Sequence, residues 1–136
     1  MNELRATLLM LGLRDGPASR FLRVSQDSLK KMLTGYRPTP PGILAELSGV
    51  HTRLTDTASR LVEKMDSLAA QGSHPCRFTL GITTTDDEAR RLGWPSFFTH
   101  AILGATVVAT CHHPVTLVDR HLPPGLDQPE EEIALL

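Results

Sequence analysis

The chain has 136 residues, a formal net charge of −1 and 40% hydrophobic residues, of which few are aromatic. This length provides one domain or two very small ones, with a core of Leu, Val, Ile, Ala and Met. No apolar run approaches the roughly 20 residues needed to cross a membrane, and the first residues do not resemble a secretory signal. Two cysteines make no disulfide framework, so we expect a cytoplasmic protein with reduced thiols and no membrane partner.

The charge is distributed unevenly along the chain. Residues 1–64 hold ten Lys and Arg against six Asp and Glu, whereas residues 65–136 hold four against nine. The basic excess lies within residues 1–41. Such asymmetry is typical of a basic surface for nucleic acid joined to an acidic remainder. Ordinary charge scatter is the alternative interpretation.

The first third of the chain predicts three short helices, over residues 2–11, 15–22 and 26–34. Leu4, Leu8 and Leu11 share one face of the first helix, and Pro17 is tolerated because it lies in the first turn of the second. Ser25 is a natural N-cap for the third helix, which Gly35 and Pro38 then stop. Two helices joined by a short turn are the layout of a DNA-reading helix-turn-helix.

This segment resembles the phage-repressor class of helix-turn-helix proteins, the Cro/cI or Xre class. Small and apolar residues occupy the positions that this class gives them: Leu13, Ala18, Phe21, Leu22, Val24, Ser25 and Leu29. The stretch from Met32 to Pro41 resembles the W-x-x-G-x-x-x-P-P ending of one subgroup, which includes anti-CRISPR-associated autorepressors. Met32 stands where that subgroup has Trp, and Arg23 stands where the turn usually has Gly.

The motif predicts two sets of DNA contacts. Side chains near the start of the third helix are expected to read base edges in the major groove: Gln26, Asp27, Ser28, Lys30 and Lys31. Phosphate contacts are expected from side chains around them: Ser25, Arg20, Arg23, Arg37 and Thr39. Without the motif, the same residues would be interpreted as a solvated helix face.

The rest of the chain predicts a long helix and a small α+β unit. Apolar residues recur at intervals of three and four over residues 41–71, a stripe that favours a partner surface for a second copy or for the C-terminal part. Alternation over residues 77–83 predicts a strand. A short helix starting at Thr85, a helix over 97–110 and a second strand near Val115 follow. The expected fold is mainly α (α+β), with domains at 1–72 and 73–121 and a flexible acidic tail at 122–136.

A homodimer is expected because one or two strands are too few to stand alone, so the sheet could be completed across two copies. The resulting interface would use apolar residues of the long helix, the first strand and the last helix: Leu54, Leu61, Met65, Leu68, Phe78, Leu80, Ile82, Phe97 and Phe98.

Catalysis and metal binding find little support. The cluster Cys111-His112-His113 contains zinc-ligand types, but adjacent residues rarely point at one metal and no C-x-x-C pair accompanies them. Asp86, Asp87 and Glu88 are explained by a helix start. We therefore expect no enzyme, no metal and no cofactor.

The expected function is that of a dimeric transcriptional regulator, an (auto)repressor of bacterial or phage origin by resemblance, which binds double-stranded DNA at a palindromic operator. The alternative is an antitoxin or adaptor that binds another protein through its C-terminal domain, with the helix-turn-helix as scaffold.

Overall fold

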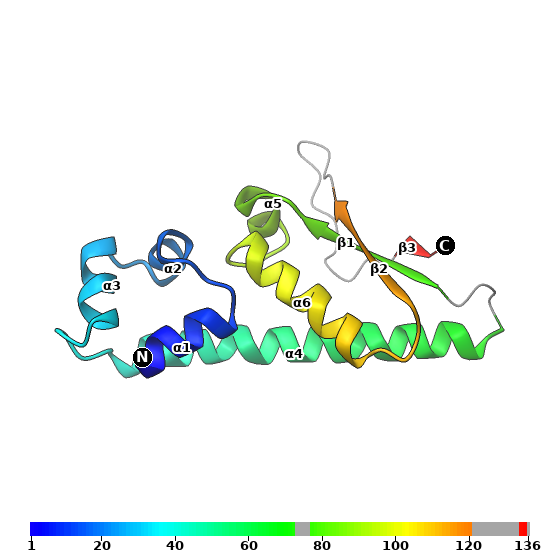
Figure 1. Cartoon of the computed structure of the whole chain (residues 1–136), viewed down its shortest axis with the longest axis horizontal. Coiled ribbons are helices and arrows are strands. Elements are labelled where there is room, and N and C mark those ends of the chain that lie inside the picture. Colours follow the sequence, from blue (N-terminus) through cyan, green and yellow to red (C-terminus); the bar gives the residue numbers. More distant parts are fainter. Residues whose placement is uncertain (73–76, 121–133, 136) are drawn as a thin grey trace.

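The structure is a computed structural model that describes residues 1–72, 77–120 and 134–135. It is mainly helical, with a small α+β part, as the sequence predicts. The molecule is elongated: the helix α4 (Pro41–Ala70) extends along most of its length, with short helices at one end and a small sheet at the other (Figure 1).

Three short helices form the N-terminal end: α1 (Glu3–Met10), α2 (Asp15–Leu22) and α3 (Gln26–Leu33). Their bounds agree with the predicted ones to within a residue at each end. The side chain of Asn2 accepts from the backbone N–H of Arg5 and starts α1, and Ser25 likewise starts α3. Both caps satisfy a backbone donor that the first turn of a helix leaves without a partner.

The helix α4 contributes to two separate cores. Its first half packs into the N-terminal core, and its second half packs into the C-terminal core. The N-terminal core consists of Leu4, Leu8, Leu11, Leu13, Ala18, Leu22, Leu29, Met32, Leu47 and Val50. The C-terminal core consists of Leu54, Ala58, Leu61, Met65, Phe78, Leu80, Ala89, Leu92, Trp94, Leu103 and Val107. The apolar stripe therefore finds its partner in the C-terminal part of the same chain.

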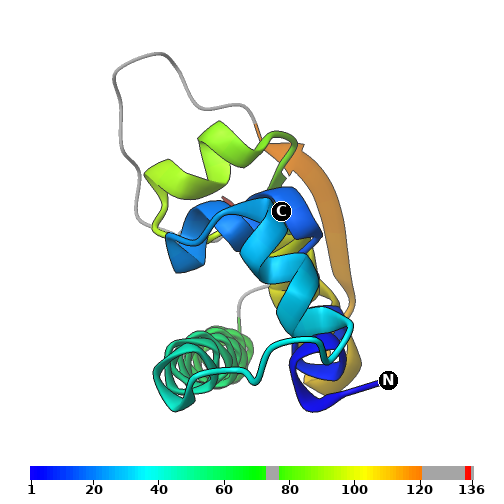
Figure 2. The same ribbon diagram turned by 90° about the vertical axis from the view of Figure 1, so that its left-hand side faces the viewer.

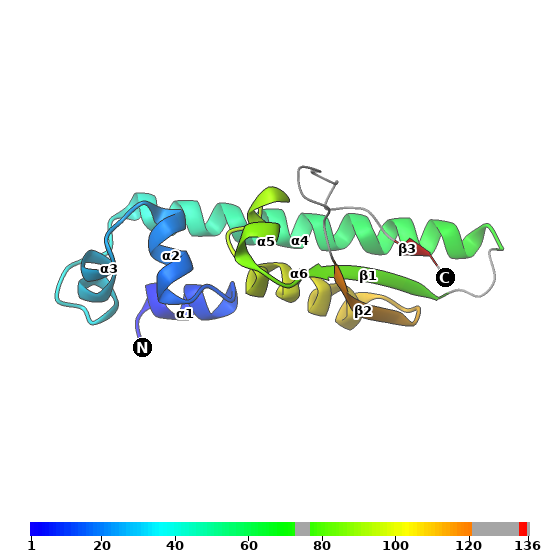
Figure 3. The ribbon, with the colours of Figure 1, turned by 90° about the horizontal axis from the view of Figure 1, so that it is seen from above.

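The C-terminal part is a parallel β-α-β crossover. Strand β1 (Phe78–Thr83) pairs in parallel with β2 (Val115–Arg120), and the helices α5 (Asp86–Arg91) and α6 (Phe97–Thr110) connect them. Parallel neighbours require such a long connection, because a tight turn can only join antiparallel strands. Seen from the sheet side, β1 lies over α6, and α6 runs next to α4 (Figure 3).

A third strand, β3 (Ala134–Leu135), pairs antiparallel with the other edge of β1, where Leu135 faces Phe78 in the register. The chain therefore supplies a third strand itself, and the pairing of the sheet with a second copy stays a prediction. The flexible acidic tail over 122–136 stays a prediction: residues 134–135 form β3, and the remainder lies outside the described residues.

The residues of the predicted dimer interface pack largely within one chain. Five of its nine residues are buried in the C-terminal core with at most 4% of their surface exposed: Leu54, Leu61, Met65, Phe78 and Leu80. Leu68, Ile82 and Phe97 pack partly buried against the same core. The ring of Phe98 lies 4.2 Å from that of Phe97 and beneath the guanidinium of Arg14. These side chains already have partners within the chain, so they leave little apolar surface for a second copy.

The two cores are joined by polar contacts as well as by α4. The buried hydroxyl of Thr99, on α6, donates to the carbonyl of Leu11 at 2.7 Å. Leu11 follows α1, so this bond satisfies one of the carbonyls that a helix end leaves without a partner. On the other side, Arg53 of α4 donates to the carbonyls of Leu92 and Gly93. The two ends of the molecule are therefore connected by one buried hydrogen bond, and the more exposed bonds of Arg53 tie α4 to the corner between α5 and α6.

Candidate DNA-binding surface

The helix α3 lies at the end of the molecule that is farthest from the sheet, and Figure 2 shows it in front of the other elements. Its apolar face is fixed by Leu29 and Met32, whose exposed fractions are 1% and 3%. Its opposite face exposes Gln26, Asp27 and Lys30. An amphipathic helix held in this way presents a rigid row of polar side chains to the outside.

The turn between α2 and α3 contains a left-handed residue that is not glycine. Arg23 has a φ of +57° and is the sole non-glycine residue with positive φ in the described part of the chain. Left-handed backbone favours glycine because other residues place their Cβ close to the following carbonyl oxygen. Val24 is half-buried in the turn and packs against the N-terminal core. The turn therefore forms with Arg23 at the position where the class that the sequence resembles usually has Gly.

The N-terminus of α3 leaves polar groups available. The hydroxyl oxygen of Ser25 accepts from the backbone N–H of Ser28 at 3.0 Å. The hydroxyl proton of Ser25 remains able to donate, and Ser25 itself is exposed. A hydroxyl donor at the positive end of a helix suits a phosphate oxygen.

The five predicted base-reading residues differ in their availability. Lys31 is half-buried, and its ammonium pairs with Asp27 at 3.0 Å, one turn earlier. Ser28 is half-buried and accepts from the guanidinium of Arg37 at 3.3 Å. Lys30, in contrast, makes no ion pair within the described residues. Gln26 and Lys30 are thus the side chains of this set that are both exposed and without a described side-chain partner.

The predicted phosphate contacts surround α3 unevenly. Arg23 and Arg37 are exposed on either side of it, before and after the helix, and Thr39 is half-buried in the following loop. Arg20 is exposed too, but it lines a hollow between α2 and the corner that joins α5 to α6. It therefore extends toward the C-terminal part of the molecule.

One positioning residue escaped the sequence prediction. The side-chain amide of Asn2 donates to the carbonyls of Met32 and Leu33, at 3.0 and 3.2 Å, while its oxygen caps α1. Asn2 thus ties the start of α1 to the end of α3 and holds the helix against the bundle. An N-cap preference in the sequence predicts only the bond that caps α1, because Met32 and Leu33 lie far along the chain.

The other candidate clusters have structural partners. His113 contacts Asp66 of α4 at 3.0 Å, and the thiol of Cys111 lies 3.7 Å from the sulfur of Met65. No group of three metal-ligand residues occurs within the described residues. Buried His100 accepts at Nδ1 from the backbone N–H of Thr83, so it is a packed residue of the fold.

The acidic residues that open α5 are explained by capping, as predicted. Thr85 caps the helix through the N–H of Glu88, and the Glu88 carboxylate accepts from the N–H of Thr84. Asp86 accepts from the N–H of Phe97 at 3.0 Å and so connects the starts of two helices.

Comparison with known proteins finds no family model that matches the chain and no curated protein with significant similarity. Within residues 1–72 and 77–120, no helix combines the length and hydropathy needed to cross a membrane.

Proposed function

We propose that the chain is a sequence-specific DNA-binding transcriptional regulator, a repressor that places α3 in the major groove of an operator. The observation that carries this proposal is the row of exposed polar residues, Gln26, Asp27 and Lys30, on a helix whose other face is buried. Gln pairs with adenine and Lys with guanine through the major-groove edges of these bases. Arg23, Arg37 and Ser25 then contact the phosphates on either side and set the register.

Lys30 and Lys64 provide a matched test of base reading. Both are exposed lysines, but Lys30 lies on α3 and Lys64 lies on the distant half of α4. Lys30→Ala and Gln26→Ala should each cost about 1–3 kcal/mol on the preferred site and relax its sequence preference. Lys64→Ala should leave binding unchanged, as measured by fluorescence anisotropy. Equal affinities for wild type, Lys30→Ala and Gln26→Ala would overturn the assignment of α3 as the reading helix.

Operator binding by a dimer needs a surface other than the predicted one, and strand β2 supplies it. In the described sheet β2 has one neighbour, so one of its edges is unpaired. Leu117 and Val118 on this strand are 40% and 42% exposed, and Val108 on α6 is 45% exposed. An edge with exposed apolar residues favours pairing with another strand.

The geometry of β2 selects a register for two antiparallel copies. The carbonyl of Pro114 accepts from Phe78, so in the parallel ladder the backbone groups of Val115, Leu117 and Asp119 point away from β1. Pairing centred on Leu117 places this residue against its own copy and Val118 against Thr116. Centring on Val118 would instead oppose Leu117 to Asp119. The first register also opposes Val115 to Asp119, but it is favoured because it pairs the exposed Leu117 with its own copy and the exposed Val118 with the β-branched Thr116.

Light scattering tests this dimer. Wild type should have twice the 14.9 kDa chain mass at micromolar concentration, whereas Leu117→Lys should have the mass of a single chain. Ala109→Lys, an exposed control on α6, should remain dimeric. A Leu117→Lys variant that stays dimeric would exclude β2 as the interface. The same edge suits the adaptor alternative, in which β2 pairs with another protein. A wild-type monomer that binds no DNA would leave this alternative in place of the regulator.

A further inference from the structure

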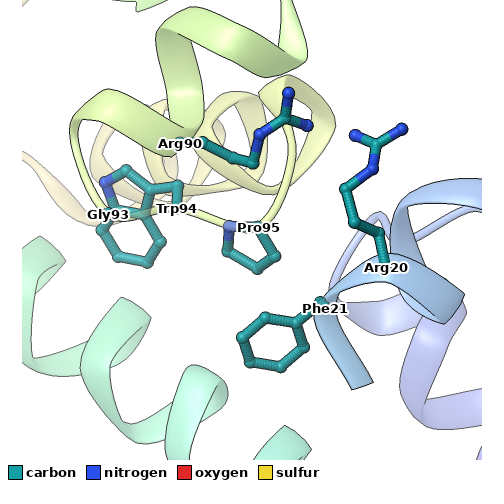
Figure 4. Close-up of a pocket in the computed structure, with 6 residues that line it drawn as sticks. All are labelled: Arg20, Phe21, Arg90, Gly93, Trp94 and Pro95. Carbon is teal, nitrogen blue, oxygen red and sulfur yellow. The ribbon is translucent and has the colours of Figure 1, made fainter. Parts of the chain in front are cut away.

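A hollow between the helix-turn-helix and the C-terminal part has the composition of a ligand site. It has a volume of about 270 Å³ and is lined by residues of α2, α5 and the corner before α6: Arg20, Phe21, Arg90, Gly93, Trp94 and Pro95. Figure 4 shows the guanidinium groups of Arg20 and Arg90 on the same side of the hollow, with the rings of Phe21 and Pro95 below them.

The charge at the rim is unbalanced. Arg20 makes no ion pair within the described residues, and Arg90 pairs only with the exposed carboxylate of Asp87, one turn earlier on α5. Two guanidinium groups that line one small hollow repel each other unless an anion lies between them. Guanidinium groups bind carboxylate and phosphate oxygens through paired N–H donors, which makes them suited to such an anion.

The floor of the hollow is fixed in place before any ligand arrives. Trp94 is 1% exposed, its backbone N–H donates to Ala89, and the guanidinium of Arg53 lies 4.3 Å over its ring. Gly93 has a φ of +87°, and a Cβ at this position would approach the Arg53 guanidinium to 3.0 Å. A rigid apolar floor lowers the cost of binding, because little has to be ordered when a ring settles on it.

We propose that this hollow binds a small organic anion with one flat ring, an aromatic carboxylate or phosphate, whose charged group lies between Arg20 and Arg90. The ring packs on Phe21 and Pro95. The volume lies just below the range of about 300–1,000 Å³ that holds drug-sized ligands, so it suits a molecule with one ring.

The position of the site gives the ligand a regulatory effect, a consequence that rests on the proposed DNA binding. Arg20 belongs to α2, which leads directly into the turn before α3. Arg20 must swing out of the hollow to make its predicted contact with an operator phosphate, and a bound ligand holds it in the hollow. Ligand and DNA therefore weaken each other's binding. The ligand lowers the affinity for DNA by the same factor as DNA lowers the affinity for the ligand, because the coupling free energy is shared.

Trp94 is the one tryptophan of the chain, and it lines the hollow. Its indole N–H signal in an NMR spectrum therefore reports ligand binding at this site in the absence of DNA. Benzoate and phenyl phosphate should shift this signal saturably, and the tighter of the two identifies the charged group. Benzamide, which has the ring without the charge, should not shift it. Acetate and inorganic phosphate, which lack the ring, should bind far more weakly.

Variants of neighbouring arginines separate the site from general surface charge. Arg90→Ala and Arg20→Ala should each weaken binding about tenfold, the effect of losing hydrogen bonds to a charged group. Arg91→Ala, the adjacent exposed arginine of α5, should bind like wild type. Unchanged circular dichroism shows that each variant is folded. The proposal is overturned if neither aromatic anion shifts the indole signal, if benzamide binds equally well, or if Arg91→Ala weakens binding as much as Arg90→Ala.

The regulatory consequence has its own readout. Saturating ligand should lower operator affinity about fivefold in wild type and should have no effect in Arg90→Ala. An unchanged operator affinity would overturn the coupling. A protein that shows the NMR shifts but binds no DNA would instead refute the proposed function and leave the ligand site standing.

Discussion

The two ends of this molecule have cores of similar kind but opposite surfaces. The helical end buries leucines and displays Gln26, Lys30 and Arg37. The sheet end buries leucines as well, but it displays the apolar residues Leu117 and Val118 on β2, one edge of which has no partner in the described sheet. The difference suggests a division of labour, in which one end meets a charged polymer and the other meets protein. The shared helix α4 makes the comparison testable, because it enters both cores.

The largest effect should come from truncating leucines of α4. Leu47→Ala removes a fully buried side chain from the N-terminal core, and Leu61→Ala removes one from the C-terminal core. Each should cost about 2–5 kcal/mol of the free energy of unfolding. Because α4 and the Thr99 bond join the cores, both variants should still unfold in a single calorimetric transition. Two separate transitions in Leu47→Ala would show that the ends are independent domains.

The bond between the two ends should give the next largest effect. Thr99→Val preserves the shape of the side chain but leaves the buried carbonyl of Leu11 without its donor. The loss should be about 1–3 kcal/mol, measured by urea unfolding. Thr106→Val is the matched control on the same helix, because its hydroxyl only bonds back to Ile102 within α6. Equal losses in the two variants would indicate that the bond between the ends adds no stability.

The position of α3 should depend on Asn2. Asn2→Asp keeps the oxygen that caps α1 but removes the amide donors to Met32 and Leu33, whereas Asn2→Ala removes both functions. Both variants should lose about 1 kcal/mol or more of stability. Hydrogen exchange should show faster opening of α3 in both, but faster opening of the first turn of α1 only in Asn2→Ala. Unchanged exchange in α3 would rule out the positioning role.

The smallest effect is expected at the turn, and it is a gain. Arg23→Gly relieves the left-handed backbone and should raise stability by about 1 kcal/mol. The same change removes a predicted phosphate contact, so affinity for all DNA sequences should fall by a similar factor. Thermal unfolding measures the first effect and anisotropy the second. A variant that is less stable than wild type would show that the Arg23 side chain is needed for the turn itself.

The helices were predictable because their ends carry local signals. Ser25, Thr85 and Ser96 cap the helices that follow them, and a glycine with positive φ follows each of α1, α3, α4 and α5, so the bounds agree within a residue. The parallel pairing of β1 with β2 had no such signal. Strand β3 has only two residues and no alternation, so its docking on β1 could not be derived from local sequence.

The candidate site was predictable only where local sequence signals determine the structure. The polar face of α3 follows from periodicity, whereas the apolar stripe of α4 does not reveal whether its partner belongs to the same chain. Leu61 and Met65 were therefore assigned to a second copy, although they pack against α6 and β1 within the chain. The approach of Arg20 to Arg90 joins residues 70 positions apart. Such pairs are set by tertiary packing and leave no trace in sequence spacing.

The account depends above all on DNA reading by α3, and selection of binding sites from a pool of random duplexes tests it most directly. The wild-type protein should enrich an inverted repeat whose half-sites are centred a whole number of helical turns apart, because a two-fold dimer presents two copies of α3 to one face of the DNA. The Gln26→Ala/Lys30→Ala variant, equally folded by circular dichroism, should enrich no comparable repeat. A wild-type protein that enriches no sequence, or a double variant that enriches the same repeat, would contradict the account.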